Sequence, residues 1–161
     1  MVHKIYFHII HTLHIIMADL NKENDNKETK IIMRSINLTK VPERLYEIEN
    51  LVELDISDNK LSIVPNTICD LKHLKKLNLF NNNLRELPMS IQSLKQLEEL
   101  HLDNNQFMTI PLGVFGLQHL RFLDTSNNQI VSVSANISNL QNLEVVHLYN
   151  NCLEELPEEM N

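Results

Sequence analysis

The sequence has little of several residue types on which small folds often depend. Its 161 residues include two cysteines, two glycines and no tryptophan, and aromatic residues make up only 5%. Cys69 and Cys152 lie far apart and neither belongs to a CxxC pair, so a disulfide framework is excluded. We therefore predict two free thiols and the reducing interior of a cell. The core must be aliphatic, since hydrophobic residues still make up 43% of the chain.

The scarcity of glycine limits how the chain can turn. Turns with a left-handed backbone usually use glycine, because it has no Cβ to clash with the main chain. Another residue must provide this conformation here. Asparagine is the candidate, since it tolerates the left-handed region and can bond its own backbone.

Positive charge is also in short supply. Lysine and arginine number 14 against 21 aspartates and glutamates, which gives a formal net charge of −7. The lysines are scattered along the chain rather than clustered. Contact with nucleic-acid phosphates needs clustered basic side chains, so we predict that nucleic acid is not a partner.

Residues 1–27 are predicted to form a leader and a linker outside the fold. The apolar segment 2–17 is too short to cross a bilayer as a helix of about 20 residues. It lacks the small-residue cleavage site of a secretory signal. Residues 19–30 are polar and predict a solvated linker.

The apolar segment leaves several interpretations open. It can be a signal or membrane anchor, an amphipathic leader, or an upstream extension with Met17 as the true start. His8, His11 and His14 interrupt the apolar run, which argues against a signal. No cysteine or carboxylate joins these histidines to complete a metal site. We expect contact with a membrane only if this segment acts as a signal or anchor.

Residues 28–161 repeat with a period of 23 residues. The clearest marker is an asparagine column, each member 23 residues after the last: Asn59, Asn82, Asn105, Asn128 and Asn151. Apolar residues keep the same phase and give the unit LxxLxLxxNxLxxLPxxIxxLxx. The pattern lapses at Ile36, Thr125 and Ser134. We count about six units, with an atypical first one and an incomplete last one.

This unit predicts an α/β solenoid. The LxL alternation has the period of a strand, so Leu54 and Ile56 point to one side and Asp55 to the other. The IxxLxx spacing suits a short helix or a 3₁₀ turn with one buried face, and the proline before it fixes φ. One unit buries little by itself. Stacked units form a parallel sheet on one side and the short helices on the other, with aliphatic side chains between them.

The asparagine column has a structural role in this interpretation. The amide group of asparagine carries two donors and one acceptor oxygen. It can therefore satisfy backbone groups in the buried turn after each strand.

This pattern resembles the leucine-rich repeat family, in particular its 23-residue intracellular type with LPxxIxxL in the second half. Among its members the chain is most similar to the Ras-group scaffolds. The resemblance covers residues 28–161. It implies a right-handed solenoid with the strands on its concave side, and a role in protein–protein recognition. A small GTPase or a phosphatase complex in the cytoplasm is the kind of partner that it implies.

The variable strand positions define the predicted binding surface on the concave side. Aromatic residues at such positions have no structural role and commonly anchor interfaces. The predicted aromatic anchors are Phe80, Phe122 and Tyr149, and the surrounding polar residues are Asp55, Glu99, Asp103, Asp124, His101 and His147. Together they predict a protein ligand with a basic surface. The alternative is that single exposed aromatics are ordinary surface residues.

The histidines and aspartates of this surface also raise the question of catalysis. They lie on an open, shallow sheet, and no serine or cysteine has a base beside it at a recognisable spacing. We therefore predict no catalytic residue, no metal and no cofactor, and an intracellular signalling adaptor as the function. One alternative is a regulatory module detached from a larger enzyme, since the array stops within a unit at residues 158–161. Another is a secreted or surface receptor-like protein, which would need a working signal peptide and favours cysteine caps.

Overall fold

The computed structural model describes residues 28–160, in which each 23-residue unit forms a strand followed by a 3₁₀ helix. The strands are β1 (Thr29–Ile32), β2 (Leu51–Asp55), β3 (Lys76–Asn78), β4 (Glu99–His101), β5 (Phe122–Asp124) and β6 (Val145–His147). The 3₁₀ helices are η1 (Glu43–Glu47), η2 (Asn66–Asp70), η3 (Met89–Ser93), η4 (Leu112–Gly116), η5 (Ala135–Asn139) and η6 (Glu158–Met160). The spacing of three in IxxLxx therefore gives 3₁₀ rather than α-helical turns, as the 3₁₀ period of three residues favours.

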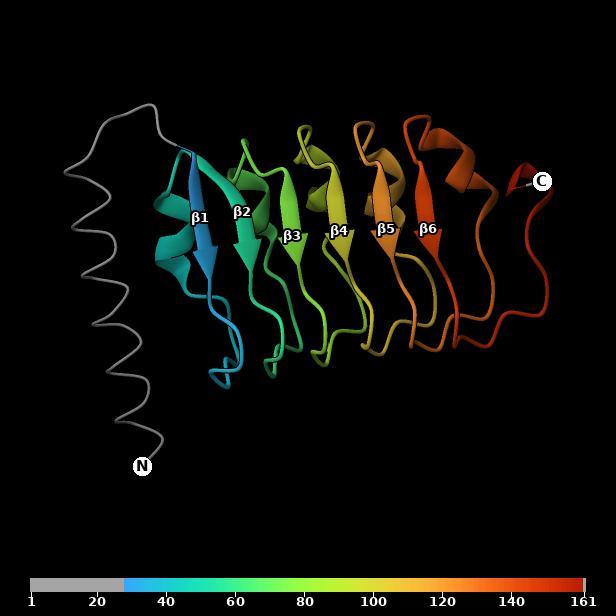
Figure 1. Cartoon of the computed structure of the whole chain (residues 1–161), viewed down its shortest axis with the longest axis horizontal. Helices are drawn as coiled ribbons and strands as arrows, with labels where there is room; N and C mark the ends of the chain where they lie inside the picture. The colour runs from blue at the N-terminus through green and yellow to red at the C-terminus, as the bar shows by residue number, and fades with distance from the viewer. Residues whose placement is uncertain (1–27, 161) are drawn as a thin grey trace.

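The six strands form one parallel sheet in the order of the sequence. Leu77 of β3 is in register with Leu54 and Leu100, each 23 residues away. Residues one sequence period apart therefore lie side by side in the sheet. Figure 1 shows the strands side by side, with the 3₁₀ helices gathered along the other side of the solenoid. This arrangement confirms the predicted α/β repeat solenoid.

Most 3₁₀ helices begin after a proline. The carbonyl of Pro88, for example, accepts a hydrogen bond of 3.0 Å from the N–H of Ile91. Ser134 replaces the proline before η5, and its side chain accepts a hydrogen bond of 3.2 Å from the N–H of Asn136. The serine therefore caps the turn by a hydrogen bond where the prolines fix φ. The lapse in the sequence pattern leaves the turn intact.

The core consists of aliphatic columns between the sheet and the 3₁₀ helices. Leu77, Leu100 and Leu123 are completely buried, whereas Val146 at the same position of the sixth unit is only partly buried. Each unit thus depends on the next one for its burial, as expected of a solenoid. Thr125 occupies a leucine position and is fully buried, and its hydroxyl donates a hydrogen bond of 3.2 Å to a backbone carbonyl. The hydroxyl is satisfied, so this second lapse is also compatible with the core.

Asparagine provides most of the left-handed backbone, as the scarcity of glycine predicts, while Ser35 and Asp58 adopt it in the first two units. A positive φ of 51° to 54° recurs at one position in five consecutive turns: Asp58, Asn81, Asn104, Asn127 and Asn150. Each lies immediately before a member of the asparagine column. Their side chains form an exposed ladder of their own, in which Asn104 Nδ2 donates to Asn81 Oδ1 at 2.6 Å. In each of these turns, one residue therefore adopts the left-handed backbone, and the asparagine after it bonds to buried backbone groups.

The two glycines serve close packing rather than turns, because neither has a positive φ. Both lie in η4. A Cβ atom on Gly113 would lie 2.7 Å from Cγ2 of Ile91 and 3.0 Å from the carbonyl oxygen of Met89. Glycine is therefore what allows η4 to approach η3 so closely.

The buried asparagine column joins each unit to the one before it. Asn105 Oδ1 accepts a hydrogen bond from the N–H of Leu84, and its Nδ2 donates to the carbonyls of Leu79 and Leu102, all at 3.0 Å. Equivalent bonds are made by Asn59, Asn82, Asn128 and Asn151. The side chain satisfies backbone groups of two consecutive units at once. These are the hydrogen bonds that the sequence predicts for this column.

The boundary between the linker and the array differs by two residues from the polar segment 19–30. Thr29 and Lys30 belong to β1, and the N–H of Thr29 donates to the carbonyl of Asn50 at 3.0 Å. These two residues form a strand despite their polar side chains, because they pair with β2. The predictions for the leader at 2–17, its histidines and Met17 lie outside the described residues. Within residues 28–160, no helix combines the length and apolar content required to cross a bilayer.

Replacing Asn105 with alanine should lower the free energy of unfolding by about 1–3 kcal/mol, because buried backbone groups lose their partners. Asn83→Ala is the matched control, since Asn83 is exposed, and it should cost under about 0.5 kcal/mol. Urea unfolding followed by circular dichroism measures both. Equal stability of the two variants would show that the buried hydrogen bonds do not stabilise the stack.

Candidate protein-binding site

The concave face is formed by three columns of side chains that project outward from the sheet. The columns are Lys30–Glu53–Lys76–Glu99–Phe122–Val145, Ile32–Asp55–Asn78–His101–Asp124–His147 and Arg34–Ser57–Phe80–Asp103–Ser126–Tyr149. The third column continues in register beyond the strands. Backbone N–H groups of Asp58, Asn81, Asn104 and Asn127 donate to the carbonyls of its next members, which are Phe80, Asp103, Ser126 and Tyr149.

A continuous row of rings crosses this face over β4, β5 and β6. The ring centroids of His101 and Phe122 are 4.9 Å apart, those of Phe122 and His147 are 5.3 Å apart, and those of His147 and Tyr149 are 6.1 Å apart. We call these four residues the aromatic strip. Tyr149 is 57% exposed. The sequence named all four as contact residues, and the structure brings them together.

Two other predicted contact residues are placed differently. Phe80 lies on the same face, is half-buried, and does not take part in these ring contacts. Glu99 has a cation beside it, since its Oε2 lies 2.7 Å from Lys76 Nζ. The hydrogen bond from Lys76 lowers the pKa of Glu99. The same lysine–glutamate pairing occurs two units earlier, between Lys30 and Glu53 at 2.9 Å.

His101 is largely enclosed, with 23% of its side chain exposed. Burial lowers its pKa, so the ring is neutral at pH 7. Its Nε2 atom is buried without a hydrogen bond and lies 3.6 Å from Glu99 Oε2. The ring therefore acts mainly as an apolar surface beside Phe122.

Asp55 was expected as an outward contact residue, yet it is only 1% exposed. Its Oδ1 accepts hydrogen bonds from the N–H and the hydroxyl of Ser57, and its Oδ2 accepts from Asn78 Nδ2 and from the guanidinium of Arg34. Burial alone would raise the pKa of Asp55, but the hydrogen bonds from Arg34 and Ser57 outweigh it and hold the pKa below its usual range. Neighbouring units cover this carboxylate, so it links β2 to both of them and is not free for a ligand.

Asp124 is the equivalent residue three units later and is also mostly buried, at 8% exposure. Its Oδ1 accepts a hydrogen bond of 2.9 Å from the N–H of Ser126, and its Oδ2 lies 3.1 Å from His147 Nδ1. The hydroxyl of Ser126 is completely buried and has no hydrogen-bond partner. The sequence prediction missed Ser126, although the D-x-S spacing shared with Asp55 and Ser57 could have indicated it.

Asp103 lies beside Asp124 on this face, and His147, whose charge also interacts with Asp103, bonds to Asp124 instead. No side chain in the described part of the chain forms a hydrogen bond or ion pair with its carboxylate. Burial, and then the negative charge of Asp124, raise the pKa of Asp103 to about 6. Within residues 28–160, no group of three or more potential metal ligands is arranged to hold an ion.

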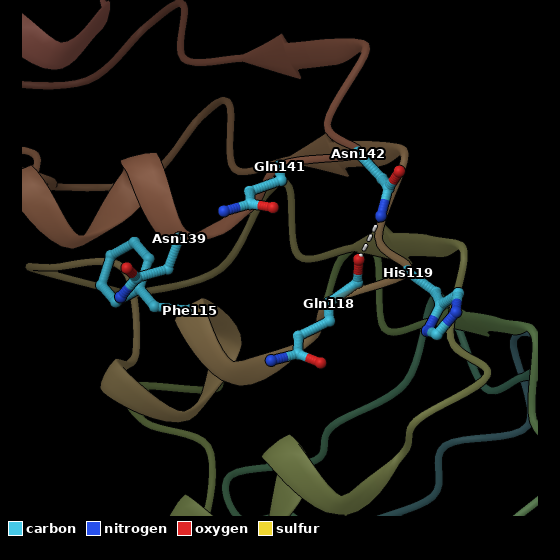
Figure 2. Close-up of a pocket in the computed structure, with 6 residues that line it drawn as sticks. All are labelled: Phe115, Gln118, His119, Asn139, Gln141 and Asn142. Atoms are coloured by element: carbon cyan, nitrogen blue, oxygen red, sulfur yellow. Dashed lines mark hydrogen bonds between the residues drawn. The ribbon is translucent and has the colours of Figure 1, made fainter.

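A hollow lies away from the sheet, beside η4 and η5. It has a volume of about 500 Å³ and is lined by Phe115, Gln118, His119, Asn139, Gln141 and Asn142. Figure 2 shows the hydrogen bond by which Asn142 Nδ2 donates to the carbonyl of Gln118 at 2.6 Å. The lining is mostly amide groups and includes no carboxylate, lysine or arginine. The concave face, with its exposed rings and unpaired carboxylate, is therefore the stronger candidate.

Replacing Asp103 with asparagine should raise the free energy of unfolding at pH 7.5 by about 1 kcal/mol, a value reduced for partial solvent exposure. The pKa of Asp103 is higher in the folded than in the unfolded chain, so the folded state keeps the proton longer. Protonation of Asp103 therefore contributes to the free energy of unfolding at low pH, and this contribution is lost as the pH rises from about 4 to about 6. Urea unfolding of both proteins between pH 4 and 7.5 measures this difference. A constant difference across that range would contradict the raised pKa.

Two family models match the chain. The model described as leucine rich repeat matches residues 29–84, and the one described as leucine rich repeats (2 copies) matches residues 72–113. Together they span more than half of the chain. No curated protein matches it.

Several solved structures are similar to the chain. A leucine-rich repeat protein of Leptospira interrogans is 34% identical with a TM-score of 0.74, over 77% of this chain and 32% of that one. The ectodomain of the receptor kinase GASSHO1/SCHENGEN3 of Arabidopsis thaliana, solved in complex with CASPARIAN STRIP INTEGRITY FACTOR 2, is 32% identical with a TM-score of 0.66, over 75% and 15%. The ectodomain of the Arabidopsis receptor kinase SOBIR1 is 27% identical with a TM-score of 0.66, over 79% and 73%.

The chain spans about a third of the length of the Leptospira protein and less of the first receptor. The family models identify the leucine-rich repeat, and the structure shows this repeat as a parallel sheet with 3₁₀ turns. The chain belongs to the leucine-rich repeat family.

Proposed function

We propose that the chain is a protein-binding scaffold whose concave face holds a protein ligand with a basic surface. The observation that carries this proposal is the aromatic strip of His101, Phe122, His147 and Tyr149. Four adjoining rings provide a rigid apolar surface, and aromatic residues are enriched among those that contribute most to binding energy. The strip lies across three consecutive strands, so a ligand on it would contact β4, β5 and β6 together.

The charge of the chain supports a basic ligand. The formal net charge is −7, which attracts a positively charged partner during encounter. On the concave face itself, Glu99 is paired with Lys76, while Asp103 has no partner side chain among the described residues. The negative charge available to a ligand is therefore concentrated beside the aromatic strip, where complementarity would fix the orientation of the ligand.

We further propose an intracellular signalling adaptor that binds a small GTPase or a phosphatase complex. The LPxxIxxL half of the repeat supports this assignment by its similarity to the Ras-group type. Cys69 and Cys152 are both free thiols, which agrees with a reducing compartment. The alternative is a receptor-like protein outside the cell, and the similarity to two plant receptor-kinase ectodomains favours it. Fractionation of cells that express the tagged chain distinguishes the two locations.

Replacing both Phe122 and Tyr149 with alanine should reduce the amount of bound partner at least tenfold, because two anchoring rings are lost. The measurement is quantitative mass spectrometry of proteins captured by the isotope-labelled wild-type and variant chains. Met89→Ala with Leu112→Ala is the matched control, since both residues are exposed hydrophobics of the 3₁₀ helices. An unchanged set of partners for the Phe122 and Tyr149 variant would contradict binding on the concave face.

A further inference from the structure

The chain contains two versions of one side-chain arrangement on its concave face. In β2, Asp55 Oδ1 accepts the N–H of Ser57 at 3.1 Å, and its Oδ2 accepts Nδ2 of Asn78 at 2.9 Å. In β5, three units later, Asp124 Oδ1 accepts the N–H of Ser126 at 2.9 Å, and its Oδ2 lies 3.1 Å from His147 Nδ1. An aspartate, the serine two residues on and a side chain of the following strand recur in the same relation.

The two arrangements differ in the unit that precedes the aspartate. In the first arrangement, the residue of the third column in that preceding unit is Arg34. Nε of its guanidinium donates to Asp55 Oδ2 at 2.8 Å. The same position in the second version is Asp103. Where the first arrangement has a cation beside the buried carboxylate, the second therefore has another carboxylate.

The second arrangement also has an unused hydroxyl group. Ser57 Oγ donates to Asp55 Oδ1 at 2.6 Å, whereas Ser126 Oγ is completely buried and has no partner. A buried hydroxyl without a partner costs free energy, and so do two adjoining negative charges. A donor-rich cation placed between Asp103 and Asp124 would remove the repulsion.

We propose that Asp103 and Asp124 form a binding site for the guanidinium group of an arginine side chain of the protein ligand. The guanidinium takes the place that Arg34 occupies against Asp55. This inference rests on the proposed function, and it assigns the ligand chemistry at one position of the concave face.

The surroundings favour arginine over a metal ion. No group of three or more potential metal ligands in residues 28–160 is arranged to hold an ion, whereas a guanidinium needs only carboxylate acceptors on one or two sides. In the third column, Phe80 precedes Asp103 by one unit and Tyr149 follows Ser126 by one unit. Backbone hydrogen bonds join these consecutive units. Their rings can pack against the stem or the face of a bound guanidinium.

The test uses acetyl-arginine amide as the probe, with the matching citrulline amide as a neutral control of the same shape. Backbone amide shifts of the full chain are followed by NMR at pH 7.5. We expect saturable shifts at Asp103, Asp124 and Ser126 with the arginine probe, and at least fivefold weaker binding of the citrulline probe. Equal binding of the two probes, or no shifts at these residues, would overturn the proposal.

Two substitutions at Asp103 make the test specific. Asp103→Arg places a guanidinium where Arg34 stands in the first arrangement, so it should raise the melting temperature and abolish the probe shifts. Asp103→Asn should weaken probe binding at least threefold without added bulk. Asp70→Arg is the control, because it makes the same charge change at an exposed residue of η2. Binding to Asp103→Arg that equals wild-type binding would place the probe elsewhere and refute the site.

The probe experiment and the capture experiment can fail separately. If the arginine probe binds while the Phe122 and Tyr149 variant keeps its partners, the guanidinium site stands and the proposed function of the aromatic strip fails. If that variant loses its partners while the arginine probe does not bind, the proposed function stands and the arginine site is wrong.

Discussion

The hydrogen bonds of the buried asparagine column are the interaction on which the rest of the structure depends. Asn105 satisfies an N–H of the previous unit and carbonyls of both units with one amide group. Without it, the turn after the strand would bury unpaired backbone groups, which is the cost that limits such turns. Because five consecutive units use the same side chain at the same place, these units stack on their neighbours in the same register.

This constant register is what gives the concave face its columns. Backbone and core positions cannot vary much, since Leu77, Leu100 and Leu123 are fully enclosed by adjoining units. The outward positions carry no such constraint, so Lys76, Phe122 and Val145 can share one column without disturbing the stack. Function in such a fold depends on which side chains become neighbours across units. The His101–Phe122 contact, between β4 and β5, is of this kind.

The sequence predicts the fold well because the repeat is a local, periodic signal. The strand positions, the asparagine column and the need for asparagine in left-handed turns all follow from spacing and from the scarcity of glycine. The candidate site was less predictable. Sequence position showed that Asp55 and Asp124 point out of the sheet, but not that the adjoining units would leave them 1% and 8% exposed. Nor did it show that Ser126 would be buried without a partner, since that depends on rotamers and on three units at once.

The third column of the concave face shows how a repeat array can carry information about its ligand. Arg34 and Asp103 occupy the same position of the repeat but carry opposite charges. Hydrogen bonds from Arg34 and Ser57 hold the pKa of Asp55 below its usual range, whereas burial, and then the charge of Asp124, raise the pKa of Asp103. The next residue after each position is hydrogen-bonded to the following unit in the same way, from Ser35 to Ser57 and from Asn104 to Ser126, so the two positions differ mainly in their side chains. In the first arrangement the cation that pairs with Asp55 comes from the chain itself. The later arrangement has two carboxylates, and a cationic side chain of a ligand would complete it.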